Sequence, residues 1–217
     1  DPYALYVLSL KARIADKDYH LSTQLYERAL KADNSVHSRF NVALDLLKEQ
    51  LPFSDSKIAQ QWMIDLASSN YPPALLQVAS LKEREQILSH STKEIFMHRI
   101  KAAIQGSPDG CYLVGNMYLT GNGVQPNPKR AFLWFMQAAR SGYQPAQYQV
   151  SLMYHAGNGV VASTAKAYAW FSLLPPIFEQ QQLTENTLRD ELNERQLKEA
   201  LDMSATLKKY YRSGRII

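Results

Sequence analysis

Residues 110–142 read GCYLVGNMYLTGNGVQPNPKRAFLWFMQAARSG, and residues 146–174 read AQYQVSLMYHAGNGVVASTAKAYAWFSLL. Both segments contain the sequence GNGV, at Gly121–Val124 and at Gly157–Val160, and the two copies are 36 residues apart. Similarity at one fixed spacing indicates an internal repeat. The same spacing aligns further residues without a gap, among them Tyr112 with Tyr148, Tyr118 with Tyr154, Ala131 with Ala167 and Trp134 with Trp170.

The same spacing continues toward the N-terminus, where the similarity is weaker. We expect about five units up to Leu174, of which the early ones are degenerate. Two sets of bulky residues keep one position of the repeat each: Phe40, Leu76, Tyr112 and Tyr148 form the first, and Tyr26, Trp62, Trp134 and Trp170 form the second, with His98 in the remaining unit.

Each unit contains two helical patterns. Apolar residues recur at helical spacing in 129–140 and again in 145–156, which predicts a pair of helices joined by a tight turn. Gly142 is expected to end the first of these helices with a positive φ. Because one pair of helices cannot bury its apolar face alone, the pattern predicts a stacked array, an all-α solenoid.

The two best-matched units resemble the Sel1-like repeat, a relative of the tetratricopeptide repeat. The pattern A-x-Y-x-(L/V)-(G/S)-x-x-Y-x-x-G-x-G-V, followed by A-x-x-W-F-x-x-A-A-x-x-G, is matched most closely over 106–174, with Gly110 in place of the usual Ala. The resemblance implies a right-handed superhelix of 36-residue helix-turn-helix units over residues 1–174. It also implies an interaction scaffold without catalytic activity.

We expect the period to stop at Pro175 and Pro176, since prolines end helices. Residues 175–217 then form capping helices and a basic tail, with helical stretches at 184–192 and 193–210. Asn193 is a candidate N-cap. The predicted apolar stripe of the last helix consists of Leu197, Ala200, Leu201 and Leu207.

By analogy with related repeats, the first helix of each unit lines a concave groove that binds a peptide or helix of a partner protein. Tyr112 and Tyr148 occupy a consensus position, so packing is the alternative explanation for them. The predicted partner-binding residues are Tyr112, Asn116, Leu119, Tyr148, Leu152 and His155. Of these six, the four that are not tyrosines vary between units, which makes them better candidates for binding.

Other chemistry finds little support in the sequence. We expect no metal and no cofactor, because the five histidines lack ligand spacing and the GNGV turns do not have the strand-helix context of a nucleotide-binding loop. Cys111 is expected to be a buried, unreactive thiol. The alternative function is an envelope enzyme or a module that binds polysaccharide or peptidoglycan, for which Asp45 and Glu83 are the nearest candidate carboxylates.

The net charge of +4 comes from the tail, because the first 207 residues hold equal numbers of basic and acidic side chains. The tail residues Lys208, Lys209, Arg212 and Arg215 are candidates for a weak contact with an acidic partner, although a solvated helix end is the commoner arrangement. No nucleic-acid partner is expected. The resemblance suggests a bacterial periplasmic or envelope protein, with the cytoplasm as the alternative.

Overall fold

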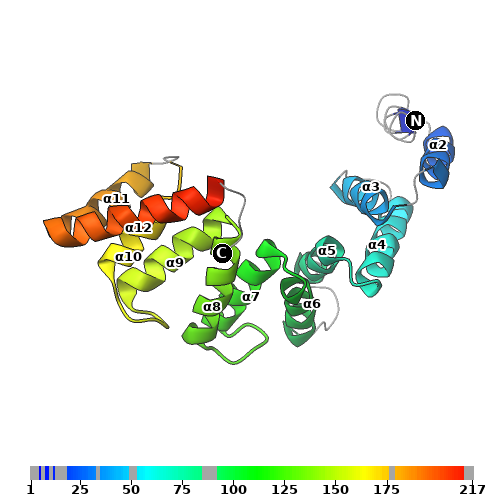
Figure 1. The fold of residues 1–217 in the computed structure, drawn as a ribbon. Helices are drawn as coiled ribbons and strands as arrows, with labels where there is room; N and C mark the ends of the chain where they lie inside the picture. The colour runs from blue at the N-terminus through cyan, green and yellow to red at the C-terminus, as the bar shows by residue number, and fades with distance from the viewer. Residues whose placement is uncertain are drawn as a thin grey trace. The chain divides into compact units, whose positions relative to one another are not determined.

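The computed structural model describes residues 5, 8, 9, 12, 19–32, 35–48, 53–84, 92–175 and 179–212. Within these residues every regular element is a helix (Figure 1). The helices are α2 (Tyr19–Ala32), α3 (Val36–Lys48), α4 (Phe53–Ser68), α5 (Pro72–Arg84), α6 (Thr92–Ile104), α7 (Pro108–Thr120), α8 (Pro128–Arg140), α9 (Gln144–Ala156), α10 (Thr164–Phe171), α11 (Glu179–Asp190) and α12 (Glu194–Arg212).

The helix starts repeat with the period found in the sequence. The first helices of successive hairpins, α3, α5, α7 and α9, begin at residues 36, 72, 108 and 144. The second helices α6, α8 and α10 begin at 92, 128 and 164. These equal intervals confirm the predicted all-α array of helical hairpins; the number of five units and the right-handed superhelix stay predictions.

The chain divides into an N-terminal unit, residues 1–78, and a C-terminal unit, residues 79–217. In the N-terminal unit α3 packs against α4, and Ala43, Ala59 and Met63 are fully buried. The ring of Tyr71 meets Phe40 edge-on at 5.5 Å, and its hydroxyl lies 3.2 Å from Nδ1 of His37. Alanine and larger aliphatic side chains therefore make the core of this unit, with the two rings at its margin.

Helix α2 ends at the predicted interval. The helices α2, α4, α6 and α8 end at residues 32, 68, 104 and 140. That Tyr26 occupies the position of Trp62 stays a prediction, because the side chain of Tyr26 lies outside the described residues.

The core of the C-terminal unit lies between consecutive helices from α6 to α10. Val114, Phe135 and Val150 are completely buried there, surrounded by small residues such as Ala131 and Ala138. Alanine lets the helix axes approach closely, so that one large ring fills the space between three helices. Gly115 is part of this fit, since a Cβ on it would lie 2.7 Å from the ring of Phe135.

Contacts between neighbouring helices recur at the repeat spacing. The rings of Phe96 and Tyr118 meet edge-on at 5.7 Å, and those of Phe132 and Tyr154 meet in the same way at 5.2 Å. Both tyrosines also carry a cation over the ring face, Arg130 at 5.7 Å and Lys166 at 5.5 Å. Such contacts add about 0.5–1 kcal/mol each at exposed sites. The two best-matched units are therefore equivalent in packing as well as in sequence.

The GNGV turns join the helices of each hairpin and contact the hairpin before. Gly123 and Gly159 have φ of 74° and 75°, as predicted for a turn that only glycine adopts without strain. A Cβ on Gly123 would lie 2.2 Å from the carbonyl oxygen of Thr92, and one on Gly159 would lie 2.3 Å from that of Pro128. The turn backbone thus rests directly on the start of the preceding second helix.

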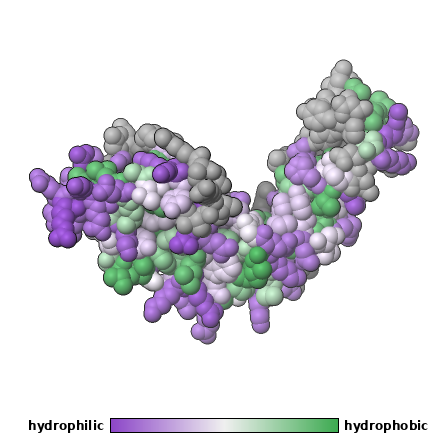
Figure 2. Space-filling model, in the orientation of Figure 1, coloured by the Kyte–Doolittle hydropathy of each residue, from purple (hydrophilic) through white to green (hydrophobic). Residues whose placement is uncertain are grey.

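Helices α11 and α12 cap the array. Leu188 and Ala200 are buried against Ala167, Tyr168 and Phe171 of α10, while the outer side of α11 and α12 is largely hydrophilic (Figure 2). The predicted N-cap is confirmed, because the Asn193 side chain accepts from the backbone N–H of Gln196 at 2.9 Å.

The predicted stripe of α12 needs one correction. Leu201 does not belong to it, because 49% of its surface is exposed. Ala200, Leu197 and Leu207 contact the two core clusters of the unit. The next buried position along the helix is Ser204, whose hydroxyl lies 2.6 Å from that of Ser172.

The expectation that the period stops after Pro175 stays a prediction. The predicted helical stretch 184–192 begins too late, because α11 already begins at residue 179, which is 35 residues after the start of α9. The apolar end of α10 is thus covered by a helix at nearly the repeat interval.

The glycine contact yields a matched test. Gly159→Ala should lower the free energy of unfolding by about 3 kcal/mol or more, because it adds a steric clash with the Pro128 carbonyl to the cost of positive φ. Gly106→Ala should cost only about 1 kcal/mol, because Gly106 has φ of 86° but no atom within 4 Å of the added Cβ. Urea denaturation measures both; equal losses would contradict the close-contact argument.

A second test concerns the docking of α12. The Tyr211 hydroxyl donates to the carbonyl oxygen of Ala139 at 2.6 Å, across 72 residues of sequence. Tyr211→Phe should destabilise this contact by about 1 kcal/mol. Native-state hydrogen exchange should then show faster exchange of the last two turns of α12 with α7 unchanged. Unaltered exchange in α12 would show that the hydroxyl does not hold the helix.

Candidate functional site

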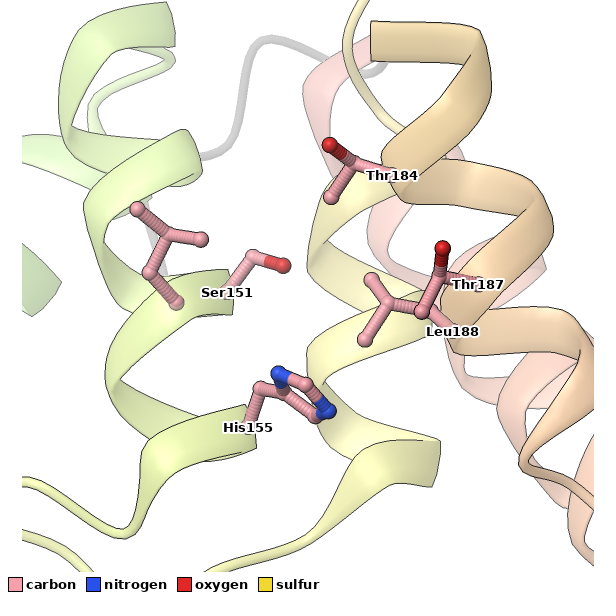
Figure 3. A pocket seen from close by; sticks show the side chains of 6 residues that line it. Ser151, His155, Thr184, Thr187 and Leu188 are labelled. Carbon is pink, nitrogen blue, oxygen red and sulfur yellow. The ribbon is translucent and has the colours of Figure 1, made fainter. Parts of the chain in front are cut away.

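A pocket of about 180 Å³ lies between α9 and α11 in the C-terminal unit (Figure 3). Residues of α9 line one side and residues of α11 the other: Ser151, Leu152, His155, Thr184, Thr187 and Leu188. Thr187 and Leu188 follow Ser151 and Leu152 by 36 residues, so the two walls come from residues that lie one repeat period apart in the sequence.

The floor of the pocket is apolar. Leu188 is 2% exposed and packs into the cluster formed by α10 and α12, while Leu152 is half-buried. The hydroxyl of Ser151 donates to the carbonyl oxygen of Ala167 at 2.8 Å, which commits its proton to the α10 backbone. A group entering the pocket consequently meets mainly hydrocarbon.

The rim is polar and connects the three helices around it. His155 Nε2 lies 2.9 and 3.1 Å from the two carboxylate oxygens of Glu191, the residue 36 positions further on. The hydroxyl of Thr164 donates to the same carboxylate at 3.4 Å. The His155 and Glu191 side chains are 38% and 42% exposed, so both groups are open to water and to a ligand.

Two of the predicted binding residues, Leu152 and His155, come together in this pocket. Tyr148 lies two turns earlier on α9, where its ring packs against Phe171 at 6.0 Å. Tyr112 makes the corresponding contact with Phe135 at 5.6 Å and also touches Tyr143 at 5.4 Å. The two tyrosines thus take part in the contacts between helices.

The remaining predicted residues, Asn116 and Leu119, lie on α7 and do not line the pocket. Leu119 packs at the margin of the core, and Asn116 is half-buried. Asn116 and Leu119 are 36 residues before Leu152 and His155, so they hold the same positions one hairpin earlier. As binding residues, all six stay a prediction.

Sequence reasoning missed the α11 side of the pocket, namely Thr184, Thr187, Leu188 and the neighbouring Glu191. These residues differ in type from the residues of α9, so no sequence similarity marks them as part of the same surface. The helix spacing held the signal, because continuing the 36-residue interval past Pro175 leads from His155 to Glu191.

Other predicted residues have local partners. Glu83 forms an ion pair with Arg99, whose side chain is only 7% exposed. Asp45 belongs to the N-terminal unit and is half-buried. His98 is half-buried, with Nδ1 2.9 Å from the carbonyl oxygen of Glu94 one turn earlier.

The tail is described only in part. Lys208 and Lys209 are exposed on α12, whereas the side chain of Arg212 and the whole of Arg215 lie outside the described residues. A contact of this tail with an acidic partner stays a prediction. Within the described ranges no group of three or more His, Cys, Asp or Glu side chains is placed to hold a metal ion.

Burial controls the ionisation of two groups near α7. It raises the pKa of the Cys111 thiol to about 11 and outweighs the lowering effect of a hydrogen bond from the backbone of Cys111. The thiol also donates weakly to the carbonyl oxygen of Ala103 at 3.6 Å. Burial, together with a hydrogen bond to Asp109, raises the pKa of Tyr143 to about 12. Both groups are therefore neutral at physiological pH, and Cys111 is the buried thiol that was predicted.

The comparisons with known proteins agree with this architecture. The family model described as Sel1 repeat matches residues 2–34, 108–143 and 144–173. The chain contains Sel1 repeats. The two C-terminal matches coincide with the best-matched units, while the match at 2–34 falls in a part of the chain where the pattern had been considered degenerate. Sel1 repeats generally serve as scaffolds for interactions between proteins.

Two solved structures resemble this chain over nearly its whole length. One is c5321, a protective antigen of uropathogenic Escherichia coli strains with an SLR fold, at a TM-score of 0.74 and 21% identity, covering 97% of this chain and 46% of c5321. The other is a Sel1 repeat protein from Oxalobacter formigenes, at a TM-score of 0.66 and 19% identity. This match covers 95% of this chain and 88% of the Oxalobacter protein. The chain thus spans under half the length of c5321. No curated protein matches this sequence at a significant level.

The state of Cys111 is open to a direct measurement. A raised pKa in the folded chain means that the thiol contributes stability below pH 9, which is lost as the pH rises toward 11. At pH 8 an aromatic disulfide reagent should react about 100-fold more slowly with the folded chain than with the chain in urea. Since Cys111 is the only cysteine, all reaction reports on it, and equal rates would contradict its burial.

Proposed function

We propose that the chain is a non-catalytic scaffold whose first helices α7, α9 and α11 bind a segment of a partner protein. The observation that carries the proposal is the pocket between α9 and α11, lined by residues that lie one repeat period apart in the sequence. Protein interfaces concentrate their binding energy where one side chain fills a well-packed pocket surrounded by polar groups. This pocket has that composition.

The volume sets the size of the group that enters. A cavity of about 150 Å³ accommodates a benzene molecule. The pocket of about 180 Å³ therefore holds one leucine, isoleucine, methionine or phenylalanine side chain of the partner. The rest of the partner segment runs past α9 and toward α7, over Asn116 and Leu119.

For the cellular setting we propose the bacterial envelope, with the cytoplasm as the alternative. The support is that both similar solved structures come from bacteria. Within the described residues no helix combines the length and the apolar character that a membrane crossing requires.

The alternative of an envelope enzyme or a polysaccharide-binding module stays a prediction. Of its two candidate carboxylates, Glu83 is engaged by Arg99, and Asp45 belongs to the other unit of the chain. A scaffold accounts for the α9–α11 pocket without further assumptions, and for that reason we favour it.

A pull-down from the native source tests the proposal. The variant Asn116→Ala/Leu152→Ala/His155→Ala should lose the partner. Truncation of a side chain at the centre of an interface typically costs more than about 1 kcal/mol of binding free energy. Leu119 is left intact because it packs against the core. The matched control is Lys129→Ala/Leu133→Ala on exposed positions of α8, which should retain the partner.

Circular dichroism must show that both variants keep the helix content of the parent chain. If the groove variant retains the same proteins as the parent and the control, the α7–α9–α11 surface does not bind them.

A further inference from the structure

From α6 to α11, the charged residues are divided between the first and the second helices of the hairpins. The first helices α7, α9 and α11 together contain four acidic residues, Asp109, Glu179, Glu185 and Asp190, and one basic residue, Arg189. The second helices α6, α8 and α10 contain one acidic residue, Glu94, and seven basic ones, Lys93, Arg99, Lys101, Lys129, Arg130, Arg140 and Lys166. The overall charge of the protein conceals this separation.

The binding positions follow the same division. No lysine or arginine occupies the predicted binding positions or the positions 36 residues after them. These are Tyr112, Asn116, Leu119, Tyr148, Leu152, His155, Thr184, Leu188 and Glu191. The charged member of the set is Glu191, which stands at the rim of the pocket next to Leu188 and Thr187. The groove therefore offers a negative group beside an apolar one.

Glu191 is held ready to accept a further hydrogen bond. A carboxylate has about four lone-pair positions, and His155 and Thr164 occupy only part of them. These two contacts fix the carboxylate at the pocket, while its 42% exposure leaves it reachable from the solvent. A fixed carboxylate loses little conformational entropy when a cation binds, which favours the contact.

We propose that the partner segment is basic: it places one apolar side chain in the α9–α11 pocket and a lysine or arginine against Glu191. This inference rests on the proposed function and specifies the partner for the same site. Glu191 follows Leu188 by three residues, close to one helical turn, so the two groups of the partner lie within about one turn of each other. The basic second helices repel such a segment and direct it to the opposite layer.

A selection from random peptides tests the chemistry directly. The probe is a phage-displayed library of peptides of about a dozen residues, selected on the immobilised full chain at low salt. We expect enrichment of peptides in which a leucine, isoleucine, methionine or phenylalanine stands within four positions of a lysine or arginine. Their affinity should fall as salt is added, because screening weakens an exposed ion pair.

Two neighbouring acids provide matched variants. Glu191→Gln should weaken binding of a selected synthetic peptide about tenfold or more, the value of one charge-assisted hydrogen bond. Asp190→Asn removes the same charge one residue earlier but leaves the contacts of Glu191 with His155 and Thr164 in place, and it should change the affinity less than about twofold. A charge exchange, Glu191→Lys with the peptide base changed to glutamate, should restore binding even if Glu191→Gln loosens α11.

The outcomes separate the two proposals. Suppose that the selected peptides lose binding with Leu152→Ala but contain no lysine or arginine, or still bind the Glu191→Gln variant. This result overturns the basic-segment inference and leaves the proposed scaffold function in place. If no selected peptide depends on Leu152, the groove function itself fails. Acidic peptides that lose binding with Lys129→Glu/Arg130→Glu would place recognition on the opposite layer. Self-association of the chain that Leu152→Ala abolishes would make a second copy the occupant; both of these results also overturn the inference.

Discussion

Stacking of the C-terminal hairpins depends on the contact between each GNGV turn and the start of the second helix in the preceding hairpin. Gly123 lies against Thr92, and Gly159 lies against Pro128, at distances that exclude a side chain. This contact fixes the interval between one hairpin and the next, because the turn cannot slide without losing it. The aromatic pairs between neighbouring helices then recur with nearly the same geometry. Because the turns fix the spacing of the hairpins, they also fix the spacing between the predicted binding residues on α7 and those on α9.

The fold was predictable because the residues that create it are specialised. Gly121 and Gly157 at the helix ends, and Trp134 and Trp170 within the helices, are recognisable wherever they occur at a fixed interval. The start of helix α11 at residue 179 was not predicted, because covering the end of α10 requires only an apolar stripe and many sequences supply one.

The candidate site was predictable in part, and the division has a physical basis. Positions that hold bulky residues in successive units, such as Tyr112 and Tyr148, bridge neighbouring helices and are constrained by packing. Positions that differ between units, such as Leu152 and His155, are free of that constraint and line the pocket. Its second wall comes from the cap, so the site includes residues from the repeat and from the segment that closes it.

The docking of α12 has a consequence for how copies of the chain can associate. A solenoid has two ends, and an uncovered end presents the same apolar face that would receive another hairpin. A second chain stacked there would repeat head to tail and build an open filament. Leu188 and Ala200 cover that face of α10, and Tyr211 anchors the far end of α12 to the α8 backbone. That face of α10 is therefore not available to a second copy of the chain, while the pocket between α9 and α11 stays open to the side.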